Sequence, residues 1–456
     1  MQVAAAMAGS TSTMAITAYT AWSSPAIVLL QTGDSPIGKP LSSEELSWVV
    51  SIYVLAGISV APILSLMLDK LGRKPTVLIS SVLLFLPWLL IIFAQNVWFL
   101  YIARFIGGAG TTMALATVSI YNGEMSDPDI RGKLGTTFSW LKVIANCLVL
   151  GIGPFVSYVS LGILCAVFPL LLAITFAFVP ESPYYLIKTG KKDEARKALM
   201  IFAANTTDSS VIEKKLLNIE DSIINENILS LKEFFMGKQF RKLILITIGI
   251  KTMQQMSGYM AVKSYLQPII SSTGSSLPAK YSSIIFGAVE IPAAILTTSL
   301  IDRAGRKPML ITSCIASAIA LISEGTYFFL QDYNKEDVSY LSWLPTTAIV
   351  LFIIASNLGI INLPYVLIGE LYPSNIKGIA VTVGTCYANI LAFLVTKFFA
   401  PVSEAWGIYT IFWIYAGFCV AGAIFVSICL PETKGKTLDE IQQCINKSKS
   451  SNIHKI

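Results

Sequence analysis

The 456 residues are 54% hydrophobic and 13% charged, with a mean hydropathy of +0.67. Soluble domains carry about 25% charged residues, so this composition excludes a soluble globular protein and indicates a polytopic membrane protein. The net charge of +6 follows the membrane topology described below, and it does not indicate a nucleic-acid surface.

Apolar runs long enough to cross a bilayer recur along the whole chain. Twelve are predicted, near 9–30, 47–68, 76–94, 97–121, 134–157, 160–179, 243–270, 281–301, 308–330, 345–369, 378–400 and 406–430. The first run lacks a basic front end and is too long for the apolar core of a signal peptide, so we expect no cleavable leader.

The basic residues predict the orientation of these spans. With both termini on the cytoplasmic side, the inner segments hold 25 of the 33 Lys and Arg residues, and the outer loops hold three, Lys39, Lys280 and Lys335. Cytoplasmic loops are enriched in Lys and Arg, so this split predicts cytoplasmic termini. A modest attraction of the inner face to anionic lipid is expected as well.

The predicted seventh span, 243–270, is more polar than its neighbours. It contains Gly258 near its middle and Pro268 near its end, together with Lys251, Gln254, Gln255, Ser257, Lys263 and Gln267. Such side chains are costly in lipid, but a local break and a watery lining make them tolerable. One interpretation is a broken membrane helix whose amides face a polar, uncharged solute. The other is a helix contact in which a glutamine bonds a neighbouring helix, and these residues alone favour neither.

Three short motifs of the first half return in the second half at nearly constant offsets. They are LDKLGRKP at 68–75 and IDRAGRKP at 301–308, Gly-Glu at 123–124 and 369–370, and Pro-Glu at 180–181 and 431–432. The duplication predicts an all-α membrane protein with twelve transmembrane helices in two six-helix bundles. The expected parts are a bundle at 1–180, a cytoplasmic linker at 181–242 with short helices at 191–200 and 209–225, a bundle at 243–430, and a tail at 431–456.

The charged residues of these motifs predict a bonded cluster at the cytoplasmic end of each bundle. Its members would be Asp69, Arg73, Glu124, Arg131 and Glu181 in the first half and Asp302, Arg306, Glu370, Lys377 and Glu432 in the second. Charge-assisted hydrogen bonds among them would tie the helices together. A latch that breaks when the inner side opens is favoured over a permanent clamp.

The set of motifs, with Ala103–Gly108 (ARFIGG), Gln254-Gln255 and PETKG at 431–435, resembles the sugar porter family of the major facilitator superfamily. Trp22-Ser23-Ser24-Pro25 is similar to the insect facilitated trehalose transporter branch. The resemblance implies a central cavity that opens alternately to each side, a small neutral sugar as substrate, and a plasma-membrane location. It implies no cofactor, no nucleic acid and no particular oligomer.

The resemblance also implies a set of sugar-binding positions. Gln254 and Gln255 match paired glutamines whose amides suit sugar hydroxyls, Tyr265 matches an outer-gate aromatic, and Tyr365 stands where relatives often have Trp. The remaining candidates are Glu290, Ser139, Asn357 and Asn389. Met260 replaces a family Asn, and half of the familiar hexose site is rewritten, so a disaccharide or another polyol becomes more plausible as the substrate.

Two ionisable residues inside spans, Lys263 and Glu290, suggest a functional pair. We hypothesise that both face the cavity, paired directly or through water. The alternative is that Lys263 reaches the outer interface and Glu290 is simply hydrogen-bonded.

Passive transport is favoured over proton coupling. Proton-coupled relatives carry an acidic residue in the first span near the fourth-span arginine, here Arg104, and Ala18 stands at that position. Symport through Glu290 and a non-transporting sugar sensor are the alternatives. An enzyme is disfavoured because no cofactor motif or nucleophile-with-base set is present, and a metal site because His454 is the single histidine.

Overall fold

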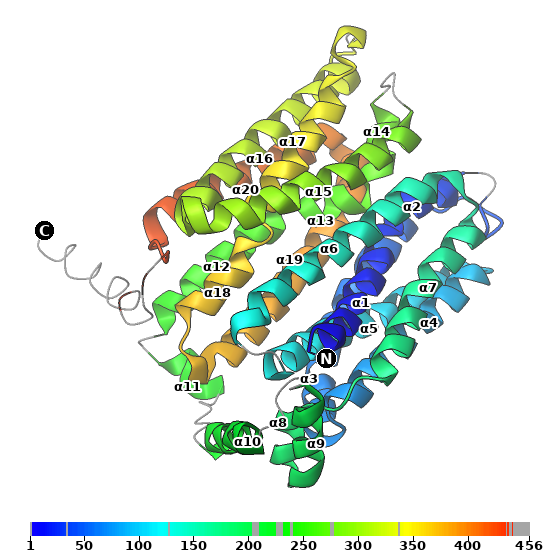
Figure 1. The fold of residues 1–456 in the computed structure, drawn as a ribbon. Coiled ribbons are helices and arrows are strands. Elements are labelled where there is room, and N and C mark those ends of the chain that lie inside the picture. The colour runs from blue at the N-terminus through cyan, green and yellow to red at the C-terminus, as the bar shows by residue number, and fades with distance from the viewer. Residues whose placement is uncertain are drawn as a thin grey trace, which may run out of the picture. The chain divides into compact units, whose positions relative to one another are not determined.

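The computed structural model describes residues 2–32, 35–125, 128–202, 209–224, 231–237, 240–273, 278–335, 338–434, 436 and 440. The side chains of 128–136, 301–302 and several single positions lie outside that description. Within the described ranges every regular element is a helix. The chain divides into two compact units, Met1–Glu226 and Asn227–Ile456, coloured blue to green and green to red in Figure 1. The domain boundaries drawn from the sequence stay predictions.

The first unit begins with seven helices. They are α1 Gln2–Ala21, α2 Ser23–Gln31, α3 Ser43–Lys70, α4 Arg73–Ile92, α5 Val97–Met125, α6 Pro128–Ile152 and α7 Tyr158–Ala177, with a 3₁₀ turn η1 at Gly153–Phe155. Helix α1 packs against α5, α6 and α7, and α5 packs against α3 and α4. A Cβ on Gly108 would lie 2.1 Å from the Tyr53 carbonyl oxygen, so a glycine here allows α3 and α5 to approach closely.

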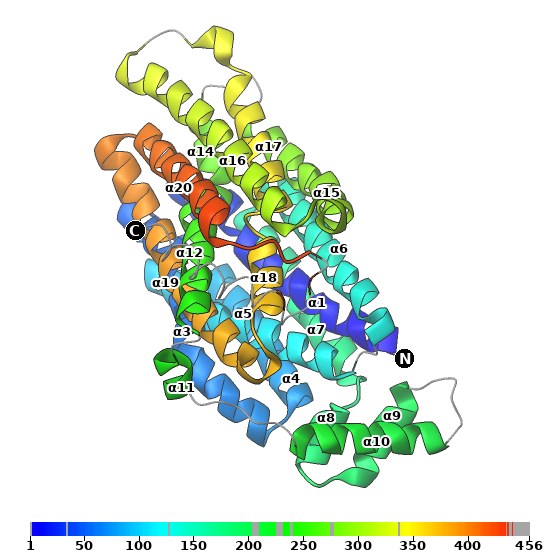
Figure 2. The same cartoon turned by 90° about the vertical axis from the view of Figure 1, so that its left-hand side faces the viewer.

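Three short helices follow in the same unit: α8 Pro183–Lys188, α9 Lys192–Phe202 and α10 Ser209–Ile224. They gather at one end of the first unit (Figures 1 and 2). Ion pairs between Arg196 and Glu213 at 2.8 Å and between Lys192 and Glu220 join α9 to α10. These two helices coincide with the short helices expected in the linker.

The second unit holds the remaining helices. They are α11 Leu231–Met236, α12 Arg241–Met256, α13 Tyr259–Ser264, α14 Leu266–Ser272, α15 Ala279–Ala304, α16 Arg306–Phe328, α17 Leu344–Leu358, α18 Leu363–Leu371, α19 Ser374–Trp406 and α20 Ile408–Cys429, with a π-helical turn η2 at Phe329–Tyr333 and a 3₁₀ turn η3 at Ser339–Leu341. Helix α16 packs against α17 and α20, and α12 packs against α18, α19 and α20.

Ten helical segments of the described chain are long and apolar enough to cross a membrane. They cover ten of the twelve predicted spans. The other two predicted spans lie in the second unit: 243–270 is divided among α12, α13 and α14, and 281–301 lies within α15. The difference from the predicted number therefore arises at the two spans in which the sequence places Gly258, Lys263 and Glu290.

Candidate functional site

The seventh span is interrupted at Gly258, as one of the two interpretations of its polar residues requires, while the facing of its amides towards a solute stays a prediction. Helix α12 ends at Met256, Gly258 has a left-handed φ of +78°, and α13 begins at Tyr259. A second interruption at Tyr265 separates α13 from α14. The chain is thus irregular where the polar residues of this span gather, as expected where a membrane helix borders polar surroundings.

Gln254 joins this break to another one. Helix α17 ends at Leu358 and α18 begins at Leu363, so a turn interrupts the predicted tenth span. Gln254 Nε2 donates to the carbonyl oxygen of Ile361 in that turn at 2.8 Å, and its Oε1 accepts from Lys251 Nζ at 3.0 Å. Because both ends of the amide are engaged, Gln254 holds the two broken spans together. Its contact with a sugar stays a prediction.

Lys251 is a buried cation with no carboxylate partner among the described side chains. It is 1% exposed, and its Nζ lies 3.9 Å from the ring centroid of Tyr365, a cation–π arrangement. Tyr365 is itself 59% exposed. Gln255 is half-buried, and its amide makes no hydrogen bond to a described residue. Gln255 and Tyr365 are therefore the predicted residues best placed to meet a ligand.

A buried polar cluster surrounds the carboxylate of Glu290 on α15. Glu290 Oε1 accepts from Lys263 Nζ at 2.8 Å and from the Tyr259 hydroxyl at 3.2 Å. Asn357 Nδ2 donates to the Tyr259 oxygen at 3.3 Å and to the Ile353 carbonyl at 2.8 Å. The cluster links α13, α15 and α17. The predicted pairing of Lys263 with Glu290 is direct, and their exposure to a cavity stays a prediction.

Replacing Glu290 with Gln is expected to leave Lys263 as an unmatched buried charge. The two side chains are only 16% and 7% exposed, and breaking a buried pair from one side costs about 3–5 kcal/mol. The thermal midpoint of the purified variant should fall by several degrees. The double variant K263M/E290Q should recover most of that loss, because no unmatched charge remains. A single variant as stable as the wild type would contradict this account.

The remaining predicted sugar contacts differ in how exposed their side chains are. Tyr265 is buried and stacks on Phe399 of α19, with ring centroids 4.6 Å apart. Asn389 on α19 is half-buried, and Ser139 on α6 of the first unit is exposed. Asn357 belongs to the Glu290 cluster described above. The structure thus brings Glu290 and Asn357 together, and it places Gln254 beside Tyr365 through Lys251.

Arg104 in the first unit is enclosed by aromatic rings and backbone carbonyls. It is fully buried and donates to the carbonyls of Val49 and Tyr19 and to the Ser23 hydroxyl, at 2.8–2.9 Å. The guanidinium carbon also lies 4.6 Å from the Tyr19 ring centroid, with the Tyr53 and Trp22 rings within 5.6 Å. No carboxylate of the described residues contacts it, so uncharged acceptors and ring faces stabilise this cation.

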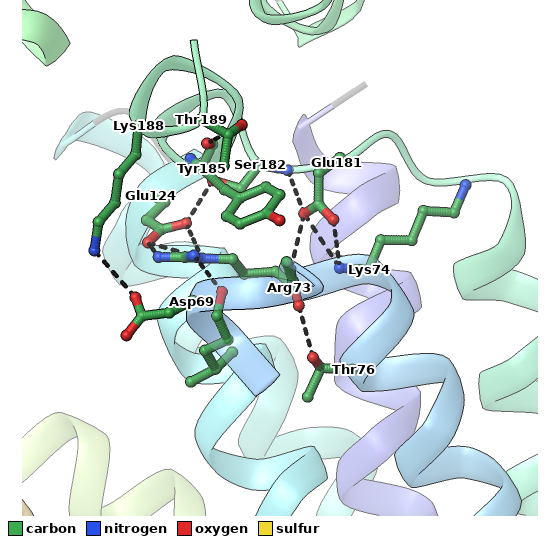
Figure 3. A network of polar contacts seen from close by, with 12 residues as sticks. Asp69, Arg73, Lys74, Thr76, Glu124, Glu181, Ser182, Tyr185, Lys188 and Thr189 are labelled. Carbon is green, nitrogen blue, oxygen red and sulfur yellow. Dashed lines mark hydrogen bonds and ion pairs between the residues drawn. The ribbon is translucent and has the colours of Figure 1, made fainter. Parts of the chain in front are cut away.

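Arg73 anchors a polar cluster where α3 meets α4 (Figure 3). We call Arg73, Glu124, Glu181 and Ser182 the Arg73 network. The guanidinium binds both carboxylate oxygens of Glu124, at 2.6 Å and 3.0 Å, and the Ser182 hydroxyl donates to Glu124 as well. Glu181 accepts from the backbone N–H groups of Arg73 and Lys74. The network ties α4 to α5 and to the segment before α8.

The second unit repeats this arrangement almost atom for atom. We call Arg306, Glu370, Glu432 and Thr433 the Arg306 network. Arg306 binds Glu370 at 3.1 Å, the Thr433 hydroxyl donates to Glu370 at 2.6 Å, and Glu432 accepts from the backbone N–H groups of Arg306 and Lys307 at 3.0 Å. The glycine before each arginine has a positive φ, 96° and 86°. The duplication in sequence is therefore a duplication of bonded structure.

The two glutamates that accept backbone N–H bonds differ electrostatically. Burial raises the pKa of Glu181, and its backbone donors offset this only in part. Burial acts in the same direction on Glu432, but there the backbone donors hold the pKa below its usual value. The carboxylate of the first unit is thus the more easily protonated of the two.

Some predicted members of these clusters lie elsewhere. Asp69 stays outside the Arg73 network and pairs with Lys188 at 3.0 Å, where both side chains are exposed. Lys377 is exposed, with its Nζ near Gly369. The side chains of Arg131 and Asp302 lie outside the described residues. Ser182 and Thr433 were not among the predicted members of the clusters. A hydroxyl residue follows Pro-Glu in both halves of the sequence, and this match could have indicated them.

A family model described as "Sugar (and other) transporter" matches residues 5–444, which is nearly the whole chain. The chain belongs to this sugar transporter family. It is a multi-pass membrane protein from a family of transporters, not of enzymes.

Two relatives illustrate its place in the family. "Facilitated trehalose transporter Tret1" of Polypedilum vanderplanki is 33% identical over 448 residues, covering 97% of this chain and 87% of that protein. The protein of the same name from Anopheles gambiae is 32% identical over 446 residues. The match covers 97% of this chain, but the chain spans only 56% of the length of that protein.

Solved structures show the same fold. The inward open xylose transporter XylE of E. coli superposes with a TM-score of 0.80, covering 96% of this chain and 98% of that one at 21% identity. XylE bound to 6-bromo-6-deoxy-D-glucose, described as a major facilitator superfamily protein, gives 0.75 at 21% identity. The predicted major facilitator fold is thereby confirmed.

Proposed function

We propose that this transporter moves a small neutral sugar passively across the plasma membrane by alternating access, with both termini in the cytoplasm. Trehalose or a hexose is the proposed substrate. The relatives named as facilitated trehalose transporters support the substrate class. The 25-to-3 distribution of Lys and Arg supports the orientation.

The environment of Arg104 is the observation that carries the passive mechanism. A proton-coupled carrier needs a group that gains and loses a proton during the cycle. Here the guanidinium is held by two carbonyls, one hydroxyl and three aromatic rings, and Ala18 precedes Tyr19 at the position where relatives carry the coupling acid. Glu290, the alternative coupling group, is already matched by Lys263 at 2.8 Å. The described part of the first unit therefore offers a fixed positive charge with no carboxylate in contact with it.

The candidate sugar contacts favour a substrate other than glucose alone. Gln254 is engaged by Lys251 and Ile361, and Met260 replaces a family Asn, so Gln255 and Tyr365 are the accessible polar and aromatic groups at the two broken spans. An amide and an exposed ring suit a sugar that presents hydroxyls and a flat apolar face. A disaccharide such as trehalose presents hydroxyls and an apolar face on each of its two rings.

Competition against labelled trehalose uptake in proteoliposomes tests this proposal. Unlabelled trehalose should compete most strongly, ahead of glucose, fructose and polyols. The variant Q255A should weaken uptake by about tenfold, the equivalent of one hydrogen bond of roughly 1.4 kcal/mol. Ser299→Ala, an exposed position on α15 whose hydroxyl bonds the Ile295 carbonyl of its own helix, serves as the control and should transport normally. Absence of any counterflow of labelled sugar would favour a non-transporting sensor.

A further inference from the structure

Glu324 is a membrane-helix carboxyl that the proposed sugar pathway does not use. It lies near the end of α16 and is 1% exposed. Neither of its carboxylate oxygens has a hydrogen-bond partner within the described part of the chain. One turn further along α16, Phe328 stacks on Phe412 of α20 and Tyr327 donates to the Thr273 carbonyl after α14. The carboxyl therefore sits in a closely packed, apolar layer.

The helices around Glu324 offer it no counter-ion. Neither α17 nor α20, the main packing partners of α16, contains an Asp, Glu, Lys or Arg, and α14 contains none either. Their titratable groups are Tyr409, Tyr415, Cys419 and Cys429, all on α20.

The other contacting elements also leave Glu324 unmatched. On α15, Glu290 is paired with Lys263, while Lys280 and Arg303 lie towards the helix ends. On α18, Glu370 binds Arg306, and on η2, Asp332 is exposed. Helix α16 itself carries Tyr327 and Cys314, and its cations Arg306 and Lys307 lie about 25 Å away along the helix axis. Among the described side chains, an ionised Glu324 would be a lone buried charge.

We propose that Glu324 is a proton-binding site that biases the transporter between conformations. A lone carboxylate in such surroundings is so costly that the group keeps its proton instead. The site binds one proton while α16 is packed against α14 and α20, and releases it when water reaches this end of α16. No other bond forms or breaks.

The consequence is a pH-dependent conformational equilibrium that is separate from sugar binding. The packed form holds a proton that an exposed carboxyl gives up, so the packed form loses stability as pH rises. The proton acts here as an effector and is not carried along with the sugar. This sets Glu324 apart from Glu290, whose charge is already matched by Lys263.

Thermal unfolding of the purified, full-length transporter between about pH 5 and pH 9 tests the proposal. Once the exposed carboxyl of the unfolded chain has ionised, the wild-type midpoint should fall by about 1–2 °C per pH unit. The variants E324Q and E324M should lack this component, and E324M should be at least as stable as the wild type at high pH, because an apolar side chain suits the layer. D332N, which removes an exposed carboxyl nearby, should follow the wild type.

Three results would overturn the proposal: a wild-type midpoint without this pH component, an E324M variant that keeps the wild-type slope, or a D332N variant that loses it. E324M keeps the test decisive where E324Q folds poorly. The readout needs no sugar, so failure of the proposed transport function would leave it interpretable. In proteoliposomes that transport sugar, the uptake rate of the wild type should also change with pH, and this pH dependence should be absent from E324Q.

Discussion

Gly258→Ala is expected to abolish sugar uptake and to reduce the amount of folded transporter severely. The left-handed φ of +78° disfavours any residue with a Cβ, by roughly 1–2 kcal/mol. A Cβ at this position would also lie 2.0 Å from Cδ2 of Tyr415 on α20, which is far inside van der Waals contact. Together the two effects exceed about 3 kcal/mol, so either the break or the packing against α20 must be lost.

Two further variants separate these causes. Gly417→Ala lies on the same helix as Tyr415, has nothing within 4 Å of its added Cβ, and should fold and transport normally. The double variant G258A/Y415A removes the clash and leaves the backbone strain, so it should recover part of the folded yield but little transport. Thermal unfolding and labelled-sugar uptake measure both quantities. A fully active G258A variant would show that the break is unnecessary.

Glu124→Gln is expected to have the second largest effect. The Arg73–Glu124 pair is 8% and 14% exposed in its side chains, and loss of one charge from such a pair costs about 3–5 kcal/mol. Glu370→Gln should cost less, because the Arg306–Glu370 pair is 16% and 28% exposed. Asp69→Asn should cost at most about 1 kcal/mol, since its pair with Lys188 is exposed. Thermal unfolding should therefore rank the three variants in that order.

The same variants test whether the Arg73 and Arg306 networks act as latches, which remains our proposal. A latch stabilises only one of two states, so E124Q and E370Q should change the ratio of inward-facing to outward-facing transporter as well as the stability. Cysteine-accessibility labelling from each side reads that ratio. A permanent clamp would lower the thermal midpoint and leave the ratio unchanged.

Much of this arrangement could be predicted because it depends on local rules. Gly258 inside a polar membrane span allows a break through its backbone freedom, and that break was one of the two interpretations of the sequence. The paired glycine–arginine motifs predict two equivalent clusters because duplicated sequence folds into duplicated structure. Lys263 and Glu290 stood out as ionisable residues in adjacent spans, and their direct pairing follows from the cost of burying either charge alone.

Other features depend on contacts between distant segments, and sequence patterns do not record those. Gln254 reaches the Ile361 carbonyl because a turn interrupts the tenth span. Gly359 and Pro364 are local signals for that turn, but they do not indicate which side chain bonds its carbonyl groups. Asp69 turns to Lys188 and away from Arg73 because α8 brings the lysine within reach. Glu324, like Glu290, is an acidic residue inside a predicted span, and it could have been singled out on the same ground. That no described residue bonds its carboxyl is visible only in the packing of α14, α17 and α20.

Uptake of labelled trehalose into proteoliposomes under an imposed inward proton gradient distinguishes a passive carrier from a proton-coupled one. The account predicts a passive carrier, which raises the internal sugar concentration to the external value and no further, and this end point is the same with and without a protonophore. Accumulation above the external concentration that the protonophore abolishes would contradict it, and so would the absence of any uptake by the folded transporter.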